Sequence, residues 1–218
     1  MKIAIPIFDG LTALDAVGPY EVLSRLPGAD VAFLGLEPGP KRTDTGMLAL
    51  HADRSLSEQA DPDVIVVPGG LGTRPLLRDE RLLGWLRTAH ETTTWTTSVC
   101  TGSLLLAAAG LLDGTDATTH WLELDTLRRL GGRPTDQRVV ERGKLITAAG
   151  DSAGSDKALL LAARIAGETT ARAIQLAMEY DPQPPFDSGS PAKAGPELVA
   201  LVRARERAAL ARETTPAP

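Results

Sequence analysis

The chain has 218 residues, a length that suits one domain with a sizeable buried core. The formal net charge of −5 argues against a nucleic-acid surface or an anionic membrane as a partner, and no window approaches the roughly 18 apolar residues that a membrane span needs. One cysteine cannot form an internal disulfide, so nothing requires an oxidising compartment. We therefore expect a cytoplasmic protein, with a single domain over 1–218 and a flexible tail at about 213–218.

The first half of the chain alternates strand-like and helix-like segments. Short β-rich apolar runs that end in turn residues predict strands buried on both faces, as in a parallel sheet; they cover 2–8, 30–36, 63–70 and 93–99. Helical patterns lie between or after them, at 18–26, 81–91 and 101–112. This alternation predicts βαβ units and an α/β fold with a mostly parallel, doubly wound sheet between helices.

The second half predicts simpler elements. Alternation at 47–56 indicates an exposed strand, and 138–147 indicates a hairpin with its turn at Arg142-Gly143. Two helices at 156–166 and 168–180 flank Gly167, a candidate C-cap. A Pro/Gly/Ser-rich surface loop at 181–196 precedes a final amphipathic helix that ends at residue 213.

Cys100 lies where a predicted strand ends and a predicted helix begins. Such a turn is sharp and tolerates only small residues two positions either side of its apex, and here these are Ser98 and Gly102. The pattern S-x-C-x-G is related to the G-x-S-x-G elbow, which presents a nucleophile. The helix N-terminus would favour a thiolate, and the Thr101 N–H would face a developing anion. The alternative is that Cys100 is a small buried core residue, as free cysteines often are.

Three other stretches offer candidate site groups, each with a structural alternative. The glycines of "PGGLG" expose backbone N–H groups, although a plain turn explains them too, and the G-x-G-x-x-G spacing of a dinucleotide site is missing. Asp15 follows the first strand and is either a site carboxylate or a helix cap. His120 is either a site residue or a structural histidine.

Several of these stretches carry a family resemblance, in order and in spacing. "LDAVGPYEVL", "VIVVPGGLGTRPL", "TSVCTGSLLLAAAGLLDG" and "ATTHW" resemble the ThiJ/PfpI superfamily of class I glutamine-amidotransferase-like proteins. Together with "IQLAMEYDPQPPFDSGSP", they are most similar to its isocyanide (isonitrile) hydratase branch. The resemblance implies a flavodoxin-like sandwich, usually a homodimer, that binds a small molecule and works without metal or organic cofactor.

The same resemblance assigns residue roles. It implies Cys100 as the nucleophile, Asp15 as its carboxylic acid partner, and Gly70 and Thr101 as backbone donors around a bound anion. Further candidates for substrate or oxyanion binding are Gly69, Gly150, Asp151 and His120. Asp151 departs from the apolar residues that the branch has in this segment. Asp151 either faces the pocket and makes it more polar, or turns away to cap the following helix.

The function implied is hydration of an isocyanide to an N-substituted formamide through a thioimidate on Cys100. A hydratase or hydrolase of small electrophilic carbonyls such as glyoxals is a rival, and so is a redox-sensing or ligand-binding protein without catalysis. The protease-like branch has His directly after the cysteine, where this chain has Thr101, and an amidotransferase needs a His-x-Glu pair that the sequence lacks. Related regulators need roughly another hundred residues for their DNA-binding helices, and the three isolated histidines show no metal-ligand spacing.

Overall fold

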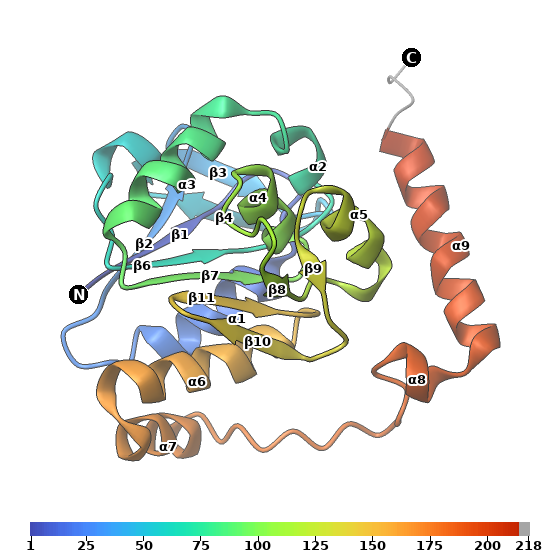
Figure 1. The fold of residues 1–218 in the computed structure, drawn as a ribbon. Helices are drawn as coiled ribbons and strands as arrows, with labels where there is room; N and C mark the ends of the chain where they lie inside the picture. Colours follow the sequence, from blue (N-terminus) through green and yellow to red (C-terminus); the bar gives the residue numbers. More distant parts are fainter. Residues whose placement is uncertain (214–218) are drawn as a thin grey trace. The chain divides into compact units, whose positions relative to one another are not determined.

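A seven-stranded sheet forms the centre of the compact unit from Met1 to Met178 (Figure 1). The computed structural model describes residues 1–213, with side chains through residue 208. In spatial order, the strands are β10 (Val139–Arg142), β11 (Leu145–Ala148), β7 (Trp95–Val99), β6 (Val64–Val67), β1 (Lys2–Pro6), β2 (Asp30–Gly35) and β5 (Arg54–Ser55). All neighbouring pairs are parallel except β10 and β11. The predicted doubly wound, mostly parallel fold is confirmed.

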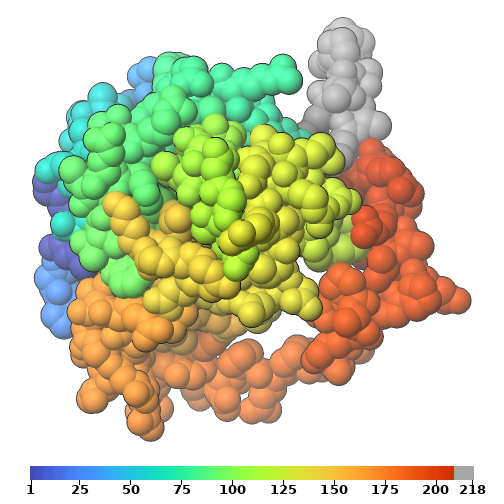
Figure 2. Space-filling model, in the orientation of Figure 1, coloured from blue at the N-terminus to red at the C-terminus, as the bar shows by residue number. Residues whose placement is uncertain are grey.

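Helices cover both faces of this sheet. On one face lie α1 (Ala13–Leu23) and α6 (Ala153–Ala166), which pack against each other, with α7 (Glu168–Ala177) beside α6. The other face carries α2 (Thr73–Leu76), α3 (Glu80–Thr92), α4 (Gly102–Ala108) and α5 (Leu124–Arg129). Figure 2 shows the two layers on opposite sides, with α3 in green and α6 and α7 in orange. Because both sheet faces are covered, all four residues of β6 are fully buried.

Most elements predicted from the sequence are present, with shifted ends. The predicted C-cap Gly167 separates α6 from α7 at a φ of 86°, a left-handed conformation that favours glycine. The hairpin of β10 and β11 turns at residues 143–144, one residue later than predicted, because Arg142 still pairs with Leu145. The predicted strand at 47–56 is two strands, β4 (Ala49–Ala52) and β5, and β4 pairs with an unpredicted strand, β3 (Gly39–Arg42).

Smaller elements complete the chain. Strands β8 (Asp116–Ala117) and β9 (Arg133–Pro134) pair in parallel, and short 3-10 helices lie at Leu56–Glu58 and Trp121–Glu123. The described residues group into two compact units that divide after Met178, so the single domain over 1–218 stays a prediction.

The second unit contains α8 (Pro191–Ala194), inside the predicted loop, and α9 (Pro196–Glu213). Leu198, Leu201 and Val202 of α9 are exposed. The predicted flexible tail lies, apart from Glu213, outside the described residues. No described helix has both the length and the apolar stretch that crossing a membrane would need.

The strand order determines where a site can form. From β1 the chain moves outward to β2 and later returns to the other side of β1 as β6, and ligands of open α/β sheets bind beside such a switch point, at the carboxyl ends of the strands. The segments that follow β1, β6, β7 and β11 therefore converge. They contain Asp15, Gly69, Cys100 and Asp151, four of the residues singled out in the sequence.

Candidate active site

Cys100 is held at a sharp turn between β7 and α4. Its φ is 54°, the left-handed region that non-glycine residues rarely occupy. Its backbone is fixed on two sides, because the Cys100 N–H donates to the Ala148 carbonyl at 3.0 Å and the Cys100 carbonyl accepts from the Thr119 hydroxyl, also at 3.0 Å. A residue held in a strained conformation by its surroundings is typical of a functional position.

The small residues on either side of Cys100 are needed for different reasons. A Cβ on Gly102 would lie 2.1 Å from the Val67 carbonyl oxygen, so only glycine lets the start of α4 approach β6 this closely. Ser98 is fully buried, and its hydroxyl has no hydrogen-bond partner among the described residues. Packing of helix against sheet therefore explains the predicted requirement for small residues here.

The Cys100 thiol is more buried than the sequence predicts. Only 6% of the residue is exposed. Burial raises the pKa of the thiol well above its ordinary value, the charges of Asp15 and Asp151 raise it further, and hydrogen bonds from Thr101 lower it only in part. Desolvation and the neighbouring carboxyl groups therefore oppose the thiolate that the helix N-terminus is predicted to favour.

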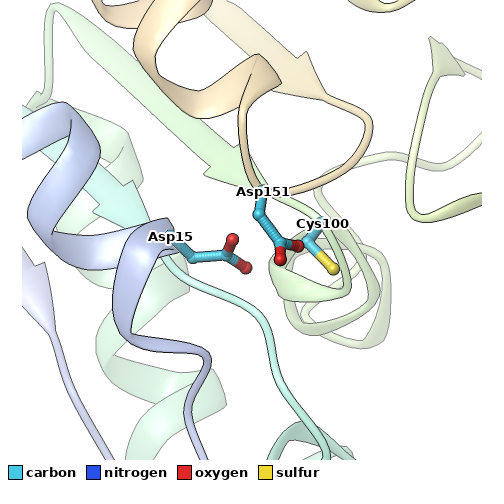
Figure 3. A group of neighbouring side chains, drawn as sticks. All are labelled: Asp15, Cys100 and Asp151. Atoms are coloured by element: carbon cyan, nitrogen blue, oxygen red, sulfur yellow. The ribbon is translucent and has the colours of Figure 1, made fainter. Parts of the chain in front are cut away.

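Asp15 lies in the first turn of α1 and is fully buried. It does not cap the helix: Thr12 is the N-cap residue, and the Asp15 carboxylate instead accepts a hydrogen bond from the Gly69 N–H at 2.9 Å. Its other carboxylate oxygen, Oδ1, is buried and has no hydrogen-bond partner among the described residues. The carboxyl group as a whole lies beside Asp151 and Cys100 (Figure 3). Of the two predicted readings of Asp15, the structure thus supports the site carboxyl.

The environment of Asp15 favours its protonated form. Burial raises the pKa of its carboxyl from 3.8 to about 8, and the negative charge of Asp151 adds to the rise. The Gly69 hydrogen bond and the positive charge of Lys157 act in the opposite direction but are weaker. The carboxyl is therefore mostly neutral at pH 7 and has a proton to give.

The glycine turn after β6 has a different task from the one predicted. The Gly70 N–H donates to the Thr101 hydroxyl at 2.9 Å, and the Gly69 N–H is used by Asp15. These amides bind the site residues together, so they are not free anion donors in this state. A Cβ on Gly69 would lie 2.5 Å from the Thr101 nitrogen and 2.9 Å from Asp15 Oδ2, which leaves no room for a side chain.

Asp151 faces the site. One carboxylate oxygen of Asp151, one of Asp15 and the Cys100 sulfur all lie within 4.8 Å of one another (Figure 3). Asp151 is exposed, whereas the other two residues are buried. Ser152 occupies the N-cap position of α6, so Asp151 is not the helix cap. Of the two predicted orientations, the structure adopts the one that makes the site polar.

Gly150 and His120 are neighbours at the edge of this cluster. A Cβ on Gly150 would lie 3.9 Å from His120 Cδ2, and the His120 ring contacts the ring of Trp121 at a centroid distance of 5.9 Å. His120 is half-buried at the start of the 3-10 helix that follows it. These contacts place His120 beside the segment that carries Asp151.

Lys157 belongs to the site's electrostatics and was missed in the sequence. It is fully buried in α6, and its ammonium donates to the Thr97 hydroxyl at 2.9 Å. Burial lowers the pKa of Lys157 from 10.5 to about 7, although the charge of Asp15 opposes this shift. A signal was available, because Lys157 stands four residues from both Ala153 and Leu161, in the apolar stripe of a helix.

The fold also creates a possible metal ligand set that sequence spacing does not reveal. Cys100, Asp15 and Asp151 are far apart in the chain, yet their ligand atoms are close enough to hold one ion.

A separate cavity of about 220 Å³ lies beside the turn after β1, and none of the candidate site residues lines it. Its lining residues are Ile7, Phe8, Asp9, Leu36, Lys41, Gly72, Pro75 and Leu76.

Curated and solved proteins resemble the chain over nearly its whole length. It is 44% identical to an isonitrile hydratase of Pseudomonas putida, over 96% of this chain and 90% of that protein. It is 36% identical to a ThiJ/PfpI family protein from Pseudomonas syringae, whose crystal structure superposes with a TM-score of 0.88 and covers 98% of this chain and 90% of that one.

A more distant relative is a longer protein with a different description. The chain is 31% identical to the HTH-type transcriptional regulator CdhR of Pseudomonas aeruginosa, over 81% of this chain but only 52% of the regulator. The model of the DJ-1/PfpI family matches residues 1–163, a range that contains Cys100, Asp15 and the other candidate site residues. The chain therefore belongs to the DJ-1/PfpI family.

Proposed function

We propose that the protein hydrates isocyanides to N-substituted formamides. The observation that carries this proposal is the fully buried Asp15 carboxyl within 4.8 Å of the Cys100 sulfur, held there by the Gly69 N–H and with its pKa raised by burial. The likeness to an isonitrile hydratase across 96% of the chain supports the same substrate class. The enzyme would be a lyase that needs no cofactor.

Cys100 acts as the nucleophile. The terminal carbon of R–N≡C is electrophilic enough for sulfur to bond to it while a proton reaches the same carbon. Because the thiol is buried and its pKa is raised, sulfur must lose its proton during the attack. Asp15 exchanges that proton, delivering its own to the carbon and receiving the thiol's, which gives the thioimidate R–N=CH–S–Cys100.

Thr101, Gly69 and Gly70 hold this pair in place. The Thr101 N–H and hydroxyl face the sulfur and lessen the cost of negative charge on it. Gly70 fixes that hydroxyl, and Gly69 fixes the acid. Gly150 and His120 are neighbours at the edge of the site, and we assign them to contacts with the substituent R.

The test uses purified protein with cyclohexyl isocyanide, and N-cyclohexylformamide is quantified by mass spectrometry. We expect formamide from the wild type and none above background from Cys100→Ser. Asp15→Asn should keep the fold and lose most of the turnover. Wild-type turnover in Asp15→Asn would refute the acid/base role, and absence of formamide from the wild type would refute the function.

The orientation of Asp151 favours a second candidate function. An exposed carboxylate in the site suits a small polar carbonyl such as a glyoxal, which would form a hemithioacetal with Cys100. Methylglyoxal assayed in parallel distinguishes the two: production of lactate without formamide would favour this second candidate. A redox-sensing role is less well supported, because the thiol is 6% exposed and its pKa is raised, and thiolate character is what peroxide attacks.

We also propose a homodimer, as the resemblance implies. Leu14, Met47 and Leu48 are large apolar residues that are 46%, 84% and 48% exposed. The segments that carry them are joined, since the Thr12 hydroxyl donates to Asp44 at 2.7 Å. Light scattering after size-exclusion chromatography measures the assembly. The cytoplasm, a reducing compartment that keeps a free thiol intact, remains our expected location.

A further inference from the structure

Asp151 is a carboxylate that the chemistry of thioimidate formation leaves unused. It stands within 4.8 Å of both the Cys100 sulfur and the Asp15 carboxylate, and it comes from a different strand end than either of them. Its surroundings are also opposite to those of Asp15, since Asp151 is exposed and Asp15 is fully buried. Two carboxyl groups in contrasting environments at one site are suited to opposite roles, one giving protons and one accepting them.

We propose that Asp151 is the general base that activates the water for hydrolysis of the thioimidate on Cys100. This inference rests on the proposed function. The water that attacks the thioimidate must enter the site from solvent. Of Cys100, Asp15 and Asp151, only Asp151 is exposed. A water that donates a hydrogen bond of about 2.8 Å to the Asp151 carboxylate and lies about 3 Å from the thioimidate carbon spans the distance between that carboxylate and a carbon bonded to the sulfur.

The proton transfers balance with these groups alone. Water oxygen bonds to the thioimidate carbon, one water proton goes to Asp151, and the nitrogen receives the proton of Asp15. The resulting R–NH–CH(OH)–S–Cys100 then loses its carbon–sulfur bond. Its hydroxyl proton returns to Asp15, the proton on Asp151 passes to the sulfur, and R–NH–CHO leaves. Both carboxyl groups and the thiol end as they began.

The same geometry explains why Asp15 cannot serve as this base. Asp15 is fully buried, its Oδ2 already accepts from the Gly69 N–H, and burial raises the pKa of its carboxyl to about 8, so it holds a proton at neutral pH. Asp151 therefore accepts the proton of water, while Asp15 supplies the proton that the nitrogen of the thioimidate receives. Loss of Asp151 should therefore stop hydrolysis of the thioimidate while formation of the thioimidate continues.

The experiment compares Asp151→Asn with the wild type under excess cyclohexyl isocyanide. We expect formamide turnover to fall at least about 100-fold. Intact mass of the variant should show one isocyanide added to Cys100, accumulating at no less than the wild-type rate of capture. Asp156→Asn, which removes a half-buried carboxylate of α6 that pairs with Arg138, is the matched control and should turn over normally. Asp151→Glu should restore part of the turnover.

Each other outcome overturns the inference. Wild-type turnover in Asp151→Asn would exclude the base. A rise in KM alone would make Asp151 a substrate-binding group, and slow adduct formation would place it in the capture step. Thermal denaturation shows whether Asp151→Asn is folded. If it is unfolded, Asp151→Glu decides: reduced turnover with adduct accumulating on Cys100 supports the base, and wild-type turnover without adduct contradicts it. If wild-type protein gives neither formamide nor adduct, the proposed function itself fails, a result distinct from failure of Asp151 alone.

Discussion

Replacing Asp15 with asparagine should make the protein more stable while it removes activity. In the folded protein the carboxyl has a pKa of about 8, against 3.8 when it is free in solution. Because the folded-state pKa is the higher one, the stability contributed by the protonated carboxyl is complete below about pH 3.8 and is lost as the pH rises through about 8. Asparagine keeps an oxygen that accepts from Gly69 and does not ionise.

The size of the effect follows from the pKa difference. Between about pH 4.5 and 7.5 the wild type loses about 1.4 kcal/mol of unfolding free energy per pH unit from this one group, or about 4 kcal/mol in total. The asparagine variant lacks this loss. The stability advantage of Asp15→Asn over the wild type should therefore grow by about 4 kcal/mol across these three pH units.

Urea denaturation followed by circular dichroism at about pH 5, 6, 7 and 8 measures this difference, with the slope m checked for constancy. Asp53→Asn is the matched control, because Asp53 is exposed and its replacement should leave the pH dependence unchanged. A constant difference between wild type and Asp15→Asn at all four pH values would show that Asp15 ionises normally in the folded protein. Asp15 would then carry no proton at neutral pH, and its assignment as the acid of the site would fail.

Three further predictions concern neighbours of this group. Lys157→Met should remove the rise in stability that the wild type shows between about pH 7 and about 10.5, where only the unfolded chain holds the lysine proton. Because the charge of Lys157 lowers the pKa of Asp15, the same variant should also raise the pH at which turnover falls as Asp15 loses its proton. Urea titrations and a pH–rate profile measure the two effects, and an unchanged pH–rate profile would refute the coupling. Gly102→Ala should lower the free energy of unfolding by at least about 3 kcal/mol, because the new Cβ meets the Val67 carbonyl oxygen. Gly84→Ala, on an open helix face, should be neutral or raise the free energy of unfolding by up to about 1 kcal/mol. Thermal denaturation compares the two variants, and equal melting temperatures would contradict the close approach at Gly102. Treatment with EDTA should leave both the turnover and the native mass of the protein unchanged. Activity that EDTA removes and Zn²⁺ restores would instead assign Cys100, Asp15 and Asp151 to a metal centre.

The sequence predicted the architecture well because strand and helix patterns depend on local chemistry. Runs such as "VIVV" can only be stable when both faces are buried, and this implies a parallel sheet covered by helices on both faces. The S-x-C-x-G spacing likewise indicated a sharp turn, which the φ of Cys100 and the tight contact of Gly102 confirm. The unpredicted strand β3 has no such pattern, since "GPKR" acquires its conformation by pairing with β4.

By itself, then, the sequence determined the class of fold and the position of the thiol, because hydrophobic periodicity and turn chemistry act over a few neighbouring residues. Only the tertiary structure decided the state of the thiol, the orientation of Asp151 and the burial of Lys157. These properties depend on desolvation and on charges that approach through space, and the residues concerned are separated along the chain by whole strands and helices. Adjacent strand ends bring them together, and that adjacency is set by the order of the sheet.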